Sequence, residues 1–85
     1  MNNDDIRNMI ERGFNDATVQ VEGDGTHFQA IVVTDEFEGL GMIERHRKVY
    51  ASLGEKIGGD IHALSIQAFT RTEWDKQQPF SVVKS

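Results

Sequence analysis

The spacing between two β-like segments constrains this fold more than any other feature of the sequence. Residues 27–34 (HFQAIVVT) and 61–70 (IHALSIQAFT) are rich in β-branched and apolar side chains. The residues between them contain a helical pattern, FEGLGMIERHRKVY, at positions 37–50. A connection of this length that contains a helix is typical of a βαβ unit, which joins two parallel strands in a right-handed crossover. We therefore predict that segments 27–34 and 61–70 run parallel.

The helix expected over residues 37–50 has one apolar side. At 100° per residue, a single arc of about 120° collects its mostly apolar side chains. These are Met42, Ile43, His46, Val49, Tyr50, Leu53 and Ile57, while Glu44, Arg45, Lys48, Ser52 and Glu55 take the other side. We predict that the apolar side packs on a sheet and that Arg45 and Lys48 face solvent.

The segments before this helix predict a helix and a hairpin. Residues 6–14 carry an apolar stripe at helical spacing, with Asn3 or Asp4 as the cap at the start of the helix. Residues 17–22 alternate in polarity and read as a strand. The short turn at residues 23–26 (GDGT) then favours antiparallel pairing of this strand with residues 27–34.

The end of the sequence predicts a third helix. Thr70 or Thr72 can cap a helix over residues 73–78, with Trp74 as its anchor to the core. Pro79 ends this helix, and residues 79–85 are expected to form a loose tail. The predicted fold is a single α+β domain over residues 1–85 in the order αββαβα. It has a three-stranded mixed sheet with helices on one face.

Composition narrows the classes of function. The net charge of −5 argues against binding nucleic acid by overall attraction, although a local basic patch remains compatible with it. The absence of cysteine excludes disulfides and any thiolate metal site within the chain. No apolar run has the length of a membrane span, and the acidic N-terminus is unlike a targeting segment. The expected location is the cytoplasm.

Two of the three histidines fall at the starts of the two predicted parallel strands. If those strands are neighbours, His27 and His62 lie at one edge of the sheet and form a two-nitrogen metal site. Two nitrogens fill half of a four-coordinate shell, so the site needs further ligands. Asp24 and Asp60 flank the pair and serve either as a third ligand or as turn residues. His46, in the apolar arc of the helix, is interpreted as a packed histidine with a hydrogen-bonded ring.

Four motifs together resemble BolA-like proteins over nearly the whole chain. They are GDGTHF at residues 23–28, FEGL at 37–40, RHRKVY at 45–50 and IHALSIQAFTRTEW at 61–74. The sequence is similar to the group within this family that carries histidine in the loop between the first two strands. The resemblance implies a fold like class II KH domains. The chain departs from the family at Gly41, where serine, a better helix cap, is common.

The resemblance implies an adaptor in iron–sulfur biology, without catalysis. Such proteins pair with monothiol glutaredoxins and share a 2Fe–2S cluster, with cysteine and a glutathione thiol on the glutaredoxin side. His27 and His62 match the two ligands on the BolA-like side. The implied roles are cluster trafficking, sensing and iron homeostasis. Histidine ligation is expected to raise the reduction potential of the cluster and link it to protonation.

Nucleic-acid binding and catalysis are the two other candidate functions. Some BolA-like proteins act as transcriptional regulators, and Arg45, Arg47 and Lys48 are then the candidate phosphate contacts. Against this, the sequence has no GxxG loop, the usual phosphate clamp of KH folds. An enzyme would need an activated nucleophile or an open metal position in a closed pocket. No Ser/His/Asp arrangement stands out, and no small-molecule substrate is expected.

Overall fold

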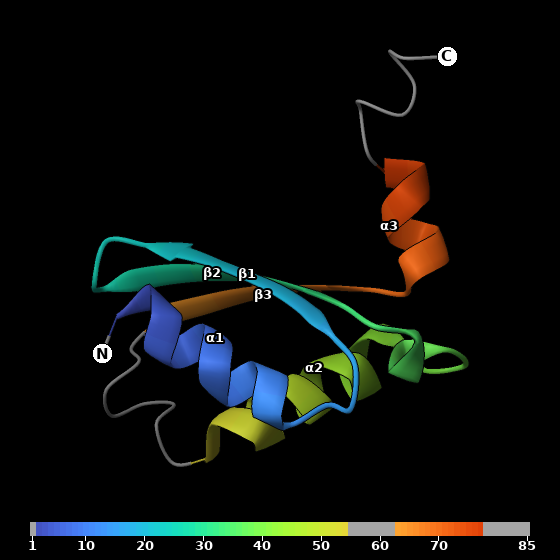
Figure 1. Ribbon diagram of the computed structural model, residues 1–85, viewed down its shortest axis with the longest axis horizontal. Coiled ribbons are helices and arrows are strands. Elements are labelled where there is room, and N and C mark those ends of the chain that lie inside the picture. Colours follow the sequence, from blue (N-terminus) through green and yellow to red (C-terminus); the bar gives the residue numbers. More distant parts are fainter. Residues whose placement is uncertain (1, 55–62, 78–85) are drawn as a thin grey trace.

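Two helices cover one face of a three-stranded sheet, and a third helix stands beyond the end of the sheet on its other side (Figure 1). The computed structural model describes residues 2–54 and 63–77. The element order is α1 (Asn3–Arg12), β1 (Thr18–Gly23), β2 (His27–Val33), a 3₁₀ turn η1 (Asp35–Phe37), α2 (Met42–Leu53), β3 (Ala63–Phe69) and α3 (Arg71–Gln77). This is the αββαβα order that the sequence predicted.

The sheet confirms the predicted crossover. Its strand order is β1-β2-β3. β1 pairs antiparallel with β2, and β2 pairs parallel with β3 with His27 opposite Ala63. No strand separates β2 from β3, so the condition for bringing the starts of these two strands together is met.

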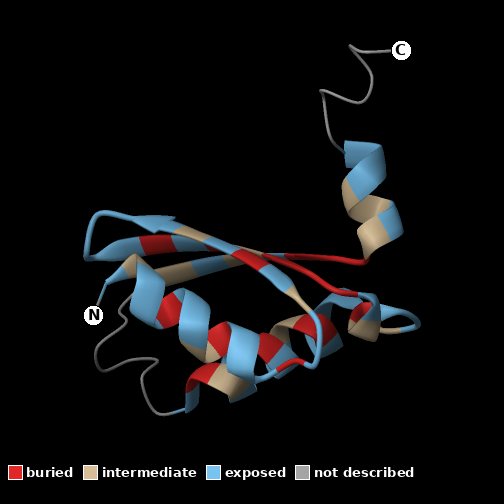
Figure 2. Cartoon of the chain, in the orientation of Figure 1, coloured by how far each residue is buried: buried red, intermediate tan, exposed pale blue. Residues whose placement is uncertain are grey.

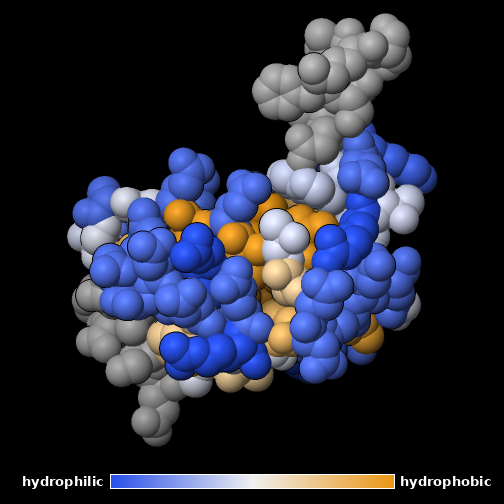
Figure 3. Space-filling model, viewed as in Figure 1, coloured by the Kyte–Doolittle hydropathy of each residue, from blue (hydrophilic) through white to orange (hydrophobic). Residues whose placement is uncertain are grey.

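The core lies between the sheet and the helices α1 and α2. Alternate residues of β2 face it, and α1 contributes an apolar stripe. Its buried members are Ile6, Ile10, Phe14, Val19, Phe28, Ala30, Val32, Phe37, Val49, Leu53 and Ala68 (Figure 2). The rings of Phe14 and Phe37 meet edge to face, with 5.4 Å between their centroids. In Figure 3 apolar surface shows in the middle of one side, with polar side chains on both flanks.

The start of α1 differs from the prediction by one residue. Asn2 is the cap, and its Oδ1 accepts a hydrogen bond from the N–H of Asp5 at 2.8 Å. The N–H of Asn2 in turn donates to Oδ2 of Asp5 at 3.2 Å. This reciprocal pair is a capping box, and it satisfies two backbone donors that the first turn leaves free.

The central helix is shorter and rotated relative to the prediction. Residues 35–37 form η1, and α2 begins at Met42 after the cap residue Gly41. Its buried residues are Arg45, Val49 and Leu53. Met42, Ile43 and Tyr50, which were assigned to the packed side, are 54%, 70% and 40% exposed. The prediction that Arg45 faces solvent is wrong, because backbone and carboxylate acceptors surround its guanidinium inside the fold.

Helix α3 also departs from the expected layer. It begins at Arg71, has no buried residue, and projects away from α1 and α2 (Figures 1 and 2). Trp74 is half-buried and packs against Phe69, with ring centroids 5.4 Å apart. Phe69 does not belong to the main core cluster, so Trp74 anchors α3 to the opposite face of the sheet. Pro79 and the predicted tail lie outside the described residues.

Candidate functional site

The turn between β1 and β2 sets the position of His27. Oδ1 of Asp24 accepts hydrogen bonds from the backbone N–H groups of Thr26 and His27, both at 2.9 Å. Gly25 has φ of 99°, a conformation that glycine adopts without strain. The two backbone hydrogen bonds, first from His27 and then from Thr26, lower the pKa of Asp24. Asp24 is therefore ionised near neutral pH and holds the turn closed.

The imidazole of His27 is open to solvent at the end of the sheet. Its side chain is 77% exposed, and Nδ1 lies 3.9 Å from Oδ2 of Asp24. Beside it is a hollow of about 360 Å³ on the sheet face that α1 and α2 leave uncovered. The residues around this hollow come from the β1–β2 hairpin and from the start of β3. They are Glu22, Gly23, Asp24, His27, Phe28, Gln29, Ala63 and Ser65.

Of the two predicted metal ligands, only His27 falls within the described residues. His62 and Asp60 lie outside them. His62 directly precedes Ala63 in the sequence, and Ala63 is the register partner of His27. Within residues 2–54 and 63–77, no group of three histidine or carboxylate side chains forms a metal site. Oδ1 of Asp24 is engaged by the turn, which explains this residue without a metal.

The described residues at this end of the sheet offer one imidazole that can ligate a metal. An exposed imidazole is a ligand for iron, and its exposure leaves room for a second molecule to approach. The carboxylate of Asp24 faces the Nδ1 side of the ring and leaves Nε2 available. The described residues thus supply one nitrogen ligand, and a complete shell requires further donors.

His46 does not join this site. It lies on α2, which covers the core face of the sheet, whereas His27 alternates with the buried Phe28 and points to the uncovered face. His46 is half-buried, as expected for a packed residue. The predicted hydrogen bond of its ring is not found among the described residues.

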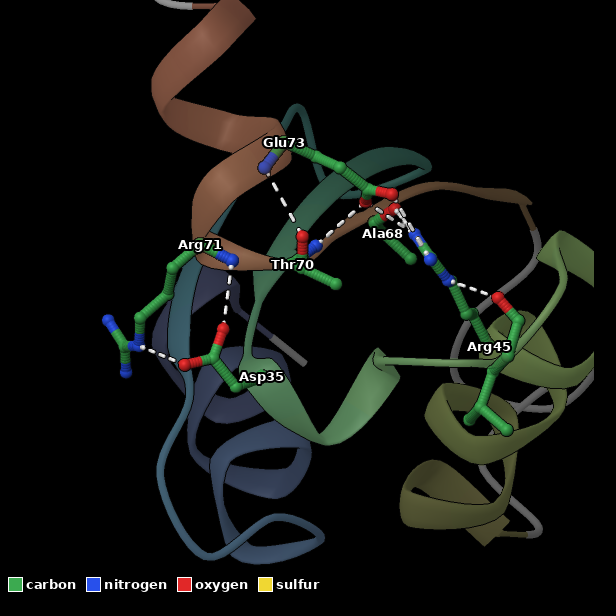
Figure 4. Close-up of polar contacts among 7 residues, drawn as sticks. Asp35, Arg45, Ala68, Thr70, Arg71 and Glu73 are labelled. Carbon is green, nitrogen blue, oxygen red and sulfur yellow. Dashed lines mark hydrogen bonds and ion pairs between the residues drawn. The ribbon is translucent and has the colours of Figure 1, made fainter.

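The sequence patterns did not predict a polar network that lies at the opposite end of β3 (Figure 4). Nε of Arg45 donates to the carbonyl of Leu40 at 2.9 Å, and Nη1 donates to the carbonyl of Ala68 at 3.2 Å. The guanidinium also binds the carboxylate of Glu73. The signal for it was the spacing Thr70-x-x-Glu73, a capping box whose carboxylate reaches the buried arginine.

The predicted basic patch is smaller than expected. Arg45 is buried and engaged in this network, so it does not offer its charge to phosphate. Arg47 and Lys48 are exposed on α2.

Every helix among the described residues is too short or too polar to span a lipid bilayer.

Comparison with known proteins identifies relatives over most of the chain. The family described as BolA-like protein matches residues 6–73. The acid stress protein IbaG of Escherichia coli is 37% identical over 79 residues, which cover 92% of this chain and 94% of that protein. Human BolA-like protein 1 is 52% identical over 52 residues. The chain spans 38% of the length of the human protein and 62% of its bovine counterpart.

Solved structures agree with the fold. A bolA protein homologue from Coxiella burnetii is 42% identical, with a TM-score of 0.81 over 88% of this chain and 97% of that one. Yeast Fra2 is 29% identical, with a TM-score of 0.72 over 91% of this chain and 87% of that one. The similarity therefore includes both the sequence motifs and the arrangement of strands and helices.

Proposed function

The chain belongs to the BolA-like family, and from this premise we propose that it is a non-catalytic adaptor in iron–sulfur cluster trafficking and iron homeostasis. Its partner is a monothiol glutaredoxin, with which it shares a 2Fe–2S cluster as a heterodimer. The glutaredoxin contributes its cysteine and a bound glutathione thiol. The adaptor contributes His27 and His62 and acts in the cytoplasm.

The observation that carries this proposal is the register of β2 with β3. His27 opens β2 directly opposite Ala63, and one peptide bond separates Ala63 from His62. His27 is thus beside the start of β3, and the proposal takes His62, the residue before Ala63 in the sequence, as the second ligand. The exposure of the His27 ring supports ligation of a metal that a second protein also holds.

The residues around His27 have defined tasks in this proposal. Asp24 fixes the backbone of His27 through the turn and lies on the Nδ1 side of its ring. A carboxylate in this position orients an imidazole and favours ligation through the other nitrogen. A bound cluster would supply an exchangeable pair of redox-active irons. No described residue needs to act as a nucleophile or a general base.

The test is anaerobic assembly of the cluster from iron, sulfide and glutathione with a monothiol glutaredoxin. Visible absorption and circular dichroism are recorded for the wild type, His27→Ala, His62→Ala and His46→Ala. A spectrum that belongs to the mixed complex, altered in the first two variants and retained in the third, is expected. The molar mass of the mixture without iron separates loss of docking from loss of ligation.

His27→Cys provides a second readout of ligation. A thiolate at this position should restore cluster binding that His27→Ala loses, and should shift the charge-transfer bands because sulfur replaces nitrogen. If the spectrum of the mixture remains that of the glutaredoxin alone for the wild type, the shared-cluster function is rejected. If the spectrum of the mixed complex forms and is unchanged in His27→Ala, another residue is the ligand.

Nucleic-acid binding is the second candidate function. The exposed side chains of Arg47 and Lys48 favour it, and one relative, 36% identical over 56 residues, is the DNA-binding transcriptional regulator BolA of Escherichia coli. With Arg45 buried, two cations remain for phosphate contacts on this segment. The net charge of −5 opposes binding outside such a patch.

A further inference from the structure

The outer edge of β3 carries peptide groups that pair with no other described strand. β3 is a terminal strand of the sheet, and β2 pairs with its inner edge. The carbonyl of Phe69 accepts a hydrogen bond from the N–H of Thr34, so the peptide groups of Phe69 face inward. Because successive residues of a strand direct their peptide groups to alternate edges, those of Leu64, Ile66 and Ala68 face outward.

Arg45 occupies one end of this edge. Its Nη1 donates to the outward carbonyl of Ala68 at 3.2 Å. Within residues 2–54 and 63–77, no hydrogen bond occupies the outward groups of Leu64 and Ile66. Among the described residues, the middle of this edge is therefore open to another strand.

The sequence of β3 lacks the features that usually keep edge strands apart. Monomeric proteins protect such edges with charged side chains, proline or bulges. β3 reads ALSIQAF and contains neither charge nor proline, and its register with β2 runs without a bulge. The opposite edge strand, β1, carries Glu22. In a chain with a net charge of −5, β3 is thus an uncharged strip.

An exposed apolar flank of α2 lies on the same side. A Cβ built at Gly13, at the end of α1, would touch the Cβ of Ser52. Ser52 is therefore on the flank of α2 that faces α1. At 100° per residue, Ile43 and Tyr50 lie about 180° and about 160° from Ser52, on the flank away from it, whereas Met42 lies about 80° from Ser52, nearer the buried Val49. Helix α1 packs toward β1, so the apolar flank of α2 lies on the side of β3. All three side chains are exposed.

We propose that this surface is a homodimer interface, in which the β3 strands of two copies pair antiparallel about a twofold axis through Ile66. A twofold interface must be self-complementary. This register places Ile66 opposite its own copy and Leu64 opposite Ala68, whose carbonyl has a second lone pair beside the one that accepts from Arg45. It also places Ser65 opposite Gln67 on the uncovered face. No carboxylate of β3 opposes another across the axis, so two acidic copies can approach here.

The proposal goes beyond the proposed function and does not depend on it. Its first test is sedimentation equilibrium from micromolar to millimolar protein, with a monomer–dimer equilibrium as the expected result. Amide exchange measured by NMR should show protection of Leu64 and Ile66 that rises with concentration. Among the described residues their N–H groups have no acceptor, and the dimer would supply one.

Paired charges at the two exposed positions of β3 test the register. In Ser65→Lys/Gln67→Lys, like charges face each other twice across the axis, so the dissociation constant should rise by about tenfold. In Ser65→Lys/Gln67→Glu the same positions carry opposite charges, and dimerisation should return. Both side chains are exposed in the monomer, and far-UV circular dichroism confirms that each variant is folded.

A second pair of variants tests the contribution of α2. Ile43→Glu places a carboxylate on the proposed interface and should weaken the dimer. Ala51→Glu adds the same charge to an exposed position about 80° around α2 from Ile43, farther from the sheet, and should leave the dimer unchanged. A wild type that stays monomeric at millimolar concentration overturns the proposal. A dimer that is insensitive to both the β3 and the α2 changes overturns it as well.

Discussion

Arg45 on α2 and Glu73 on α3 form a two-point ion pair between residues 28 apart in the sequence. Nη1 lies 2.6 Å from Oε1, and Nη2 lies 3.2 Å from Oε2 (Figure 4). The arginine side chain is 7% exposed and the glutamate side chain 44%. The same carboxylate accepts the N–H of Thr70, so one group closes the start of α3 and fixes it to α2.

Replacement of Arg45 by methionine should destabilise the fold. The change keeps an apolar stem but leaves the carbonyls of Leu40 and Ala68 without their donor. The free energy of unfolding should fall by about 2–4 kcal/mol, as expected for unsatisfied buried acceptors. Arg47→Met is the matched control and should change it by about 0.5 kcal/mol or less, because Arg47 is exposed. Urea denaturation measures both, and equal effects would contradict the assigned role of Arg45.

Stability should fall in acid through Glu73. The side-chain hydrogen bond from Arg45, followed by the backbone hydrogen bond from Thr70, lowers the pKa of Glu73 from 4.5 to about 2. The folded state thus favours the ionised carboxylate, which stabilises it fully above pH 4.5 and progressively less down to about pH 2. Glu73→Gln should be less stable than the wild type at pH 6.

The difference between the two proteins should shrink as the pH falls through this window. Chemical denaturation at several pH values between 6 and 2 measures it. Asp75→Asn, which removes one exposed carboxylate from the same helix, controls for the change in net charge. A difference between the wild type and Glu73→Gln that does not depend on pH would contradict the ion pair as its source.

Contact between α1 and α2 at Gly13 allows a test of helix packing. A Cβ added at Gly13 would overlap that of Ser52, although the backbone of Gly13, with φ of −80°, accepts alanine. Gly13→Ala should lower the free energy of unfolding by about 1–3 kcal/mol through overpacking. Gly13→Ala should lower the free energy of unfolding less in the Ser52→Gly variant than in the wild type. Thermal denaturation of the four proteins in this double-mutant cycle measures the coupling, which should vanish if the helices do not meet here.

Binding to DNA, if it uses α2, should depend on Arg47 and Lys48 and not on Arg45. Reversal of both exposed charges to glutamate should lower affinity for duplex DNA and flatten its dependence on salt, because fewer counterions are released. Fluorescence anisotropy at several salt concentrations measures this slope. An unchanged slope would remove α2 from consideration as the phosphate contact.

Local patterns predicted the strands and the crossover well. The alternation in residues 17–22, the GDGT turn and the apolar run at 27–34 lie within a few residues of the observed hairpin. The length of the connection predicted parallel pairing of β2 with β3, and the sheet confirms it. The position of His27 beside the start of β3 followed from that topology. The role of His62 stays a prediction.

The rotation of α2 was predicted wrongly, because its apolar residues span a wide arc. Ile43, His46 and Val49 suggested one buried side, whereas Arg45, Val49 and Leu53 form the observed one. A helical wheel treats an arginine as a surface residue, since a lone buried charge is costly. Arg45 is buried because Leu40, Ala68 and Glu73 supply acceptors from three other segments.

Sequence patterns were sufficient to predict the order of the elements, the hairpin, the parallel crossover and the placement of His27 at the end of the sheet. These features depend on neighbouring residues and on the length of a connection, which are local quantities. The folded chain was needed to show which side of α2 is buried, where α3 stands, and which strand edge has no partner among the described residues. Each of these depends on acceptors and surfaces from distant segments, and their positions become defined only when the chain is folded.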